Sequence, residues 1–258
     1  RAPLKKARIT ENPSVHTKVD KVIGDVDLKA SNALTYLYKS DFDENTLSKL
    51  LSIGVLGLKK RRTLVPTRFS ITAVDDILGK GILKELREYK MIDSYHMYTG
   101  SYLGNYYVIL LFPEVFTYEL FELYLPGSAW NTASGAKAAT DYEDYYGRKS
   151  YADSTCGGYY AARLPVLKQL KSLKRQASVL VLRFETPEYY ASLGVWVVRS
   201  AATKTMNNTP KIFDTKEEML ASAKQYVWDL LKFDINDLLH RSKLLENINN
   251  QIKLTQFF

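Results

Sequence analysis

Residues 91–125 read MIDSYHMYTGSYLGNYYVILLFPEVFTYELFELYL and decide the fold class. The stretch is rich in Tyr, Val, Ile and Phe, the residue types that favour β-strands. Glycine, serine and proline separate it into shorter apolar runs. The pattern predicts three strands, over residues 91–98, 105–112 and 115–125, and their simplest arrangement is an antiparallel meander.

Helical patterns precede this stretch. Leucines recur at helical spacing over residues 27–38, and a second helix is expected after Asp43. A third helix is expected to begin near Thr72, with Asp75 at the three-residue offset of a capping pair.

After the stretch, leucine spacing predicts a helix over residues 163–175. Asp214 and Glu217 form a candidate capping box for a helix over residues 216–231, and Asp234 is expected to start a short one. Apolar runs at 178–184 and 195–199 predict two more strands. The predicted fold class is therefore α+β (mixed α/β), with a central, largely antiparallel, aromatic-rich sheet flanked by helices.

The chain's 258 residues, 46% of them hydrophobic, suit one large domain. We expect a lead-in segment over residues 1–14, a core domain over 15–240 and a flexible tail over 241–258. No apolar run approaches the roughly 20 residues of a membrane span, and no secretory signal is expected. The single cysteine, Cys156, fits a reducing, cytoplasmic compartment and is expected to be a small buried thiol.

Basic residues outnumber acidic ones, 36 to 28, and this balance favours a polyanionic partner such as DNA. Two clusters are candidates for phosphate contacts, because guanidinium and ammonium groups suit phosphate oxygens. Either cluster could instead be a solvated surface. The candidate residues are Lys59, Lys60, Arg61, Arg62 and Arg68 in the first cluster and Arg163, Lys168 and Lys171 in the second.

Carboxylates that lie close in sequence raise a second possibility. Two or three of them could hold a divalent cation in a metal-dependent enzyme that acts on phosphate esters, or they could be ordinary helix caps and surface groups. No P-loop motif is present. The candidate catalytic residues are Asp75, Asp76, Asp141, Glu143 and Tyr159, which would form one composite site with Arg68 and Arg163; no metal ligand is assigned.

Several stretches, read together, resemble the archaeal Nre family of DNA repair proteins. They are DVDLKA (25–30), RRTLVPTRFSITAVDD (61–76), DYE (141–143), GGYYAAR (157–163), PEY (187–189) and GVW (194–196), with a Gln-x-x-Leu-x-x-Phe-Phe terminus. The resemblance covers nearly all of the chain. It implies a role in DNA repair, an interaction with the sliding clamp (PCNA), and a zinc-binding, cysteine-rich region ahead of the residues present here.

The carboxyl terminus resembles a clamp-binding box. Gln251, Leu254 and Phe257 are three residues apart and Phe258 follows. In a 3₁₀ turn, residues three apart fall on one side, so the leucine and the rings can enter one apolar pocket.

The sequence therefore favours a DNA repair factor that binds DNA and docks on the sliding clamp. The alternatives are a metal-dependent enzyme acting on nucleic-acid phosphate esters or damaged nucleotides, and a scaffold without DNA contacts of its own. The sequence leaves open whether the protein is catalytic.

Overall fold

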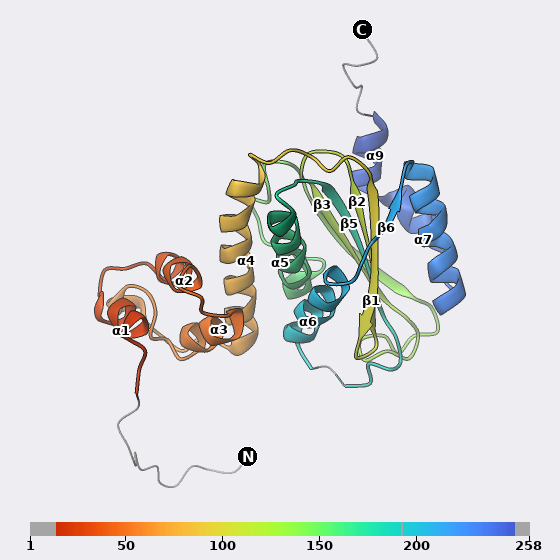
Figure 1. Cartoon of the computed structure of the whole chain (residues 1–258). Helices are drawn as coiled ribbons and strands as arrows, with labels where there is room; N and C mark the ends of the chain where they lie inside the picture. The colour runs from red at the N-terminus through yellow and green to blue at the C-terminus, as the bar shows by residue number, and fades with distance from the viewer. Residues whose placement is uncertain (1–13, 192, 251–258) are drawn as a thin grey trace. The chain divides into compact units, whose positions relative to one another are not determined.

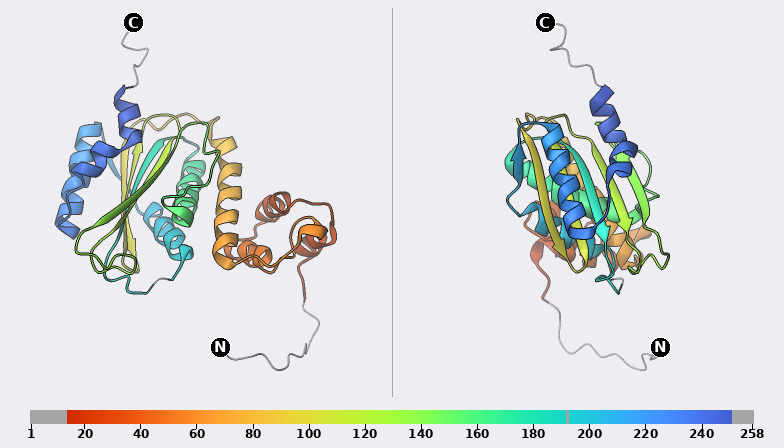
Figure 2. Two further views of the ribbon diagram at one scale, coloured as in Figure 1. Left: turned by 180° about the vertical axis from the view of Figure 1, so that it is seen from behind. Right: turned by 90° about the vertical axis from the view of Figure 1, so that its right-hand side faces the viewer.

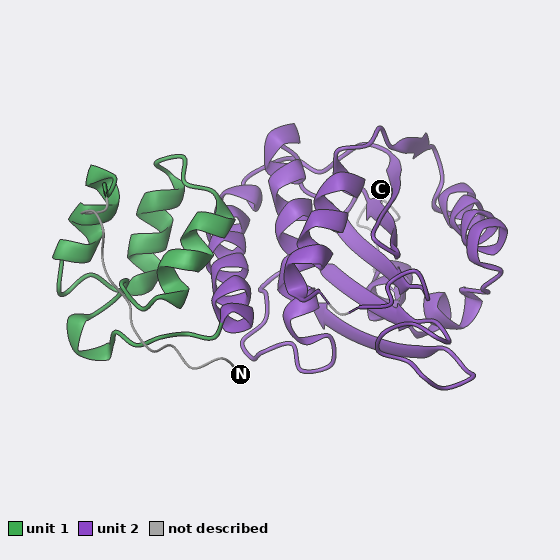
Figure 3. Cartoon of the chain, turned by 90° about the horizontal axis from the view of Figure 1, so that it is seen from below, with its two compact units in different colours: residues 1–66 green, residues 67–258 purple. Residues whose placement is uncertain are grey.

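The fold was analysed in a computed structural model that describes residues 14–191 and 193–250. The chain separates into two compact units, residues 1–66 and 67–258, which Figure 3 colours differently. The sequence suggested a different division, with one core over 15–240. In the described parts of the chain, no helix combines the length and the apolar character that crossing a membrane requires.

The first unit is built from short helices. These are α1 (Thr17–Gly24), α2 (Ala30–Tyr38), α3 (Glu44–Ser52) and the 3₁₀ helix η1 (Lys59–Arg61). Leu34, Leu37 and Leu47 are fully buried in its core. Asp43 caps α3 by accepting hydrogen bonds from Thr46 and Asn45, and the bond from the Thr46 side chain is the main reason that its pKa is lowered.

The second unit contains a six-stranded sheet with the strand order β4-β3-β5-β2-β1-β6. Its strands are β1 (Tyr95–Tyr102), β2 (Asn105–Phe112), β3 (Tyr118–Tyr124), β4 (Lys137–Glu143), β5 (Ser178–Glu185) and β6 (Lys211–Phe213). All neighbouring pairs are antiparallel except β3 with β5, which is parallel. The predicted α+β class with a largely antiparallel sheet is confirmed.

Helices cover both faces of the sheet. The helices α5 (Cys156–Leu173) and α6 (Val195–Met206) pack on one face, and α4 (Thr67–Leu86) packs on the outside of α5 (Figure 1). The opposite face carries α7 (Lys216–Leu231), α8 (Asn236–Arg241) and α9 (Lys243–Asn250), as Figure 2 shows from two further sides.

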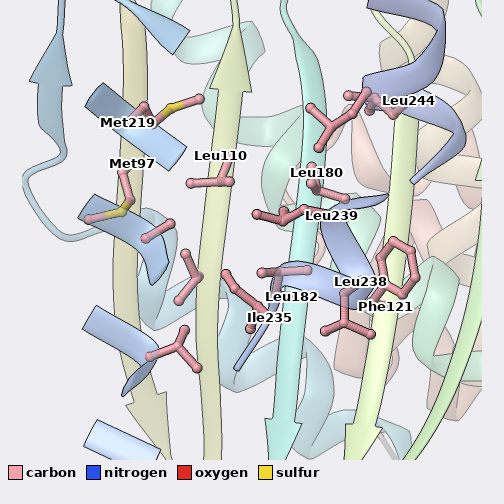
Figure 4. Close-up of a cluster of buried hydrophobic side chains, with 14 of the residues drawn as sticks. Met97, Leu110, Phe121, Leu180, Leu182, Met219, Ile235, Leu238, Leu239 and Leu244 are labelled. Carbon is pink, nitrogen blue, oxygen red and sulfur yellow. The ribbon is translucent and has the colours of Figure 1, made fainter. Parts of the chain in front are cut away.

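An apolar cluster fills the space between the sheet and α7–α9 (Figure 4). Met97, Leu110 and Leu182 reach it from three strands, and Met219 and Leu239 reach it from the helices. All eight residues of β5 are buried because helices cover both faces of this strand. This burial explains why residues 178–184 read as a continuous apolar run without alternation.

A buried carboxylate holds α9 to the sheet. Glu119 of β3 is 1% exposed and accepts hydrogen bonds from the Ser242 hydroxyl (2.5 Å) and from the backbone N–H groups of Lys243 and Leu244. It therefore satisfies the free N–H groups at the start of α9 from another element of the fold. Burial raises the pKa of Glu119 although these donors oppose the shift.

The predicted meander is wrong, because β5 lies between β2 and β3. The hairpin of β1 and β2 forms as expected, but residues 113–117 then span the gap that a third strand fills. A strand contributed from 60 residues further along cannot be recognised from the local pattern. Both β2 and β3 are buried and need partners on two edges, which β5 supplies.

Three local predictions also need correction. Residues 195–199 begin helix α6 instead of forming a strand, because Val197, Val198, Ala201 and Ala202 make one buried helical stripe. The helix expected near Thr72 already begins at Thr67. The capping box of α7 uses the next residue along, Thr215 with Glu218.

The two glycines inside α4 have different surroundings, and this difference yields a test of the packing. A Cβ atom on Gly79 would lie 2.8 Å from Nη1 of Arg163 and 3.3 Å from Leu167, whereas Gly81 has open space around it. We expect Gly79→Ala to destabilise the protein by about 1–3 kcal/mol through overpacking. The matched variant Gly81→Ala should stabilise it by roughly 0.5–1 kcal/mol. Thermal unfolding of both variants checks the pair, and equal effects would contradict the close approach of α4 to α5.

Candidate functional site

The amino-terminal half of α5 lies among buried charged side chains, which include Glu122, Glu143 and its own Arg163. Its Gly157-Gly158 pair lets the helix approach the sheet, since a Cβ on Gly158 would clash with Oε1 of Glu122 in β3. Two cavities of similar size border this half of the helix.

The first cavity, here called the α4–α5 cavity, has a volume of about 280 Å³. It is framed by α4, by α5, and by the end of β4 with the loop that follows it. Its lining is rich in cationic and aromatic side chains. The lining residues are Asp76, Lys80, Leu83, Lys84, Arg87, Glu143, Tyr146, Gly147, Arg148, Ser150, Tyr159, Tyr160 and Arg163.

A buried ion pair forms the floor of this cavity. Arg163 donates from Nε and Nη2 to the two oxygens of Glu143, at 2.5 and 3.1 Å, and both residues are only 3% exposed. Burial opposes the charge of Arg163, but Glu143 outweighs that cost and raises its pKa. The pair joins α5 to the end of β4.

Two buried hydrogen-bond donors in the wall of the cavity have no acceptor among the described residues. They are the hydroxyl of Tyr159, which is 1% exposed, and Nε of Arg87. Arg87 donates from Nη2 to the Tyr145 carbonyl and lies over the Tyr145 ring, while Arg148 lies over the Tyr159 ring. Burial raises the pKa of Tyr159, so its hydroxyl is a neutral donor at neutral pH.

Asp141 does not line the cavity itself, but it pairs with Arg148, which does. It accepts hydrogen bonds from the Thr155 hydroxyl and from the backbone N–H groups of Thr155 and Ser154, and it pairs with Arg148 at 3.1 Å. The carboxylate therefore fixes both the start of α5 and the arginine that faces the cavity.

The composite site predicted from the sequence is only partly assembled. Asp76, Glu143, Tyr159 and Arg163 line one cavity, and Asp141 supports it through Arg148. Asp75 is buried and pairs with Arg199 of α6 at 2.5 Å, outside that lining. Arg68 is also outside the lining.

The basic residues predicted to contact phosphate differ in their exposure and in whether they already form ion pairs. Lys59, Lys60, Arg61 and Arg68 are exposed, and Arg68 lies over the Phe69 ring. Lys168 is half-buried, and Lys171 pairs with Glu85 at 2.7 Å.

Arg62 holds the first unit together. Its guanidinium donates to the carbonyls of Gly57, Ile23 and Asp25, so this arginine fastens the loop before η1 to the end of α1. The guanidinium groups of Arg62 and of the buried Arg163 are therefore engaged in holding the fold together. The charge pattern of the sequence could not distinguish these two arginines from the exposed ones.

The second cavity, of about 270 Å³, lies at the first turn of α5 beside β3 and β5. Arg183 is buried there and donates to Glu122 (2.6 Å), Glu185 (3.2 Å) and Asn105 (2.6 and 2.9 Å). Burial raises the pKa of Glu185. Each charge of this group has a partner, which is what a buried ionic network requires.

Cys156 lies at the edge of the second cavity. It is exposed, with a φ of 50°, so the expectation of a small buried thiol is wrong. Partial burial and the neighbouring carboxylates raise the pKa of its thiol, which disfavours the thiolate.

No group of three or more His, Cys, Asp or Glu side chains placed to hold a metal ion occurs within residues 14–191 and 193–250. The predicted clamp-binding residues, Gln251, Leu254, Phe257 and Phe258, lie outside the described residues.

Comparison with known proteins agrees with the resemblance seen in the sequence. Residues 1–131 match the family model described as archaeal Nre, N-terminal, and residues 143–257 match archaeal Nre, C-terminal. The chain belongs to the archaeal Nre family. No solved structure matches this Nre chain.

Curated relatives cover most of the Nre chain. It is 41% identical over 220 residues to DNA repair protein NreA of Archaeoglobus fulgidus, an alignment that covers 85% of this chain and 56% of the relative. It is 35% identical over 254 residues to DNA repair protein NreA of Haloferax volcanii, with 98% and 60% covered, and 36% identical to DNA repair protein NreB of Archaeoglobus fulgidus, with 95% and 61% covered. The Nre chain thus spans somewhat more than half the length of these relatives.

Sequence reasoning missed four arginine and glutamate residues of the two cavities, namely Arg87, Arg148, Glu122 and Arg183. Arg183 had a usable signal, because an arginine inside an apolar strand must find a buried partner. Arg148 had a weaker signal, namely its position two residues after the acidic and aromatic segment 141–146.

The buried pair of the Nre chain should be far more important for stability than the exposed pair beside it. We expect Glu143→Ala to lower the free energy of unfolding by about 3–5 kcal/mol, because it leaves Arg163 buried without a counter-charge. Asp76→Asn removes the exposed pair with Lys80 and should cost at most about 0.5 kcal/mol. Denaturant titrations measure both, and a small effect of Glu143→Ala would show that water reaches Arg163.

Proposed function

We propose that this chain is the part of an archaeal DNA repair protein that binds DNA. The observation that carries the proposal is the lining of the α4–α5 cavity, where five cationic side chains meet two carboxylates and the Tyr146 ring, which is 81% exposed. Cations suit phosphates, and an exposed ring suits an unpaired base. The relatives are named DNA repair proteins, which supports the same conclusion.

Exposed cations of the first unit supply a second set of phosphate contacts in this proposal. Lys59, Lys60 and Arg61 follow one another in η1 and are all exposed. Arg62 is left out of this set because three carbonyls already occupy its guanidinium.

A binding role has better support than the alternative of a metal-dependent enzyme. Asp75 and Glu143 are each paired with an arginine, and Asp141 accepts three hydrogen bonds besides its pair with Arg148. Carboxylates engaged in this way would have to exchange their partners before they could hold a cation or transfer a proton.

Neutralising the exposed cations tests DNA binding. We expect a variant with Lys59, Lys60, Arg61 and Lys84 changed to Gln to bind single-stranded DNA more weakly. Its dependence of affinity on salt should become shallower, by up to ~0.7 log unit for each lost phosphate contact. Fluorescence anisotropy at several salt concentrations measures both quantities.

The control removes the same charge elsewhere. Lys49, Lys211, Lys224 and Lys232 are exposed and lie outside both sets, so changing them to Gln should leave the salt slope near that of the unaltered protein. If the two quadruple variants behave alike, the contacts are non-specific and this assignment fails.

We propose further that the carboxyl-terminal residues Gln251, Leu254, Phe257 and Phe258 bind the sliding clamp. The support is the Gln-x-x-Leu-x-x-Phe-Phe spacing, which gathers three apolar side chains for one pocket. Helix α9 ends at Asn250, directly before this box.

Changing Leu254, Phe257 and Phe258 together to Ala should abolish clamp binding and leave the fold intact. Each buried apolar side chain contributes roughly 1.5–3 kcal/mol before the cost of ordering the segment. Calorimetric titration with an archaeal clamp measures the loss, with Lys253→Ala as a control within the same segment. Undiminished binding by the triple variant would refute the box.

A further inference from the structure

We infer that the α4–α5 cavity is a site for a phosphomonoester, the terminal phosphate of a DNA strand, which is received by Tyr159, Arg87, Arg148 and Lys84. This inference rests on the proposed function and deepens it, because it names the part of the DNA that the cavity takes. It starts from the two donors of the cavity wall that have no acceptor among the described residues.

A buried donor without an acceptor loses its hydrogen bonds to water and gains nothing in return. Two such donors, the Tyr159 hydroxyl and Arg87 Nε, belong to residues that line one cavity; Tyr159 lies in α5, and Arg87 lies in the turn that follows α4. The Arg87 Nε–H can only donate and the Tyr159 hydroxyl can donate as well as accept, so both can serve one acceptor that enters the cavity.

The charges around these donors require the acceptor to be an anion. Of the two lining carboxylates, Glu143 is engaged by Arg163 and Asp76 by Lys80. Among the residues that the structure describes, Lys84 has no carboxylate partner, and Arg148 pairs with Asp141, which also accepts three other hydrogen bonds. The lining therefore keeps an excess of positive charge, which a phosphomonoester of roughly −1.5 to −2 at neutral pH matches better than a carboxylate of one charge.

The depth of the donors selects a terminal phosphate. Tyr159 is 1% exposed and Arg163 below it is 3% exposed, so these groups lie under the surface rather than on it. Backbone phosphates inside a strand carry a nucleotide on each side, and they meet cations that project from a protein surface. A phosphate at a strand end has one free side and can enter a cavity of about 280 Å³. The exposed Tyr146 ring at the same cavity can then stack on the terminal base.

The experiment compares strand ends on one oligonucleotide sequence. Short single strands with a 5′-phosphate, with a 3′-phosphate, or with hydroxyls at both ends are titrated with the full chain by fluorescence anisotropy. We expect one phosphorylated end to bind about tenfold more tightly than the unphosphorylated strand, the effect of one or two charged hydrogen bonds. Inorganic phosphate should compete with that end and leave binding of the unphosphorylated strand unchanged.

Two tyrosines provide a matched pair of variants. Tyr118 is buried beside Tyr159 with the rings in edge contact, its hydroxyl also lacks a partner among the described residues, and it does not line the cavity. Tyr159→Phe should remove most of the preference for the phosphorylated end and retain the affinity for the unphosphorylated strand. Tyr118→Phe should change neither. Arg87→Lys, which retains the charge and removes the Nε–H, should reproduce the loss without depending on the Tyr159 variant.

The possible results separate this inference from the proposed function. Equal binding of all three strands, or equal behaviour of the two tyrosine variants, overturns the terminal-phosphate site while DNA binding stands. If none of the strands binds, DNA binding fails. Titration with inorganic phosphate and with a nucleoside monophosphate then decides about the cavity: binding that Tyr159→Phe weakens supports a phosphomonoester site, and no binding overturns it.

Discussion

The ion pair between Arg163 and Glu143 is the interaction on which the architecture of the second unit depends. It connects the middle of α5 to the last residue of β4, and it lies directly under Gly79 of α4. The absence of a side chain at Gly79 is what allows α4 to cover this pair. The Arg163–Glu143 pair thus connects the sheet to α5, and the lack of a side chain at Gly79 lets α4 pack over that pair.

Buried charges recur in this fold, and each belongs to a junction between elements. Arg183 connects β5 to β3 and to β2 through Glu122 and Asn105, and Arg199 connects α6 to α4 through Asp75. Such pairs add little net stability compared with apolar residues of the same size. Removing one partner, however, strongly destabilises the fold, because the other charge then stays buried without a counter-charge. These pairs join elements that lie far apart in the sequence, so a shift of one element against another would break them and leave buried charges without partners.

The sequence was sufficient for the fold class and for most elements, because their signals are local. The strand at 105–112 and the helix at 216–231 follow from residue types and spacing within each segment. The position of β5 between β2 and β3 depends on pairing across some 60 residues, which no local pattern contains.

Of the candidate site too, one part could be predicted from local sequence and another part could not. Asp76, Glu143, Tyr159 and Arg163 were recognised because charges and rings concentrate in their segments. The separation of Asp75 from Asp76 was not foreseeable, since neighbouring residues on a helix point about 100° apart and only the packing decides which is buried. That the Tyr159 hydroxyl finds no partner within residues 14–191 and 193–250 depends on three-dimensional contacts alone.

The hydrogen bonds from α9 to Glu119 fix the place on the second unit from which the proposed clamp-binding box begins. Because α9 is fastened to β3, the chain beyond Asn250 starts from a fixed point on the second unit. Even a fully extended stretch of eight residues spans at most about 29 Å, so a clamp that binds the proposed box could be held no farther than that from the end of α9. A clamp held by the terminal box would thus keep its DNA at a high effective concentration near the sheet. The Glu119 hydrogen bonds and the burial of Leu244 and Leu245 in the core together keep α9 from lengthening that reach.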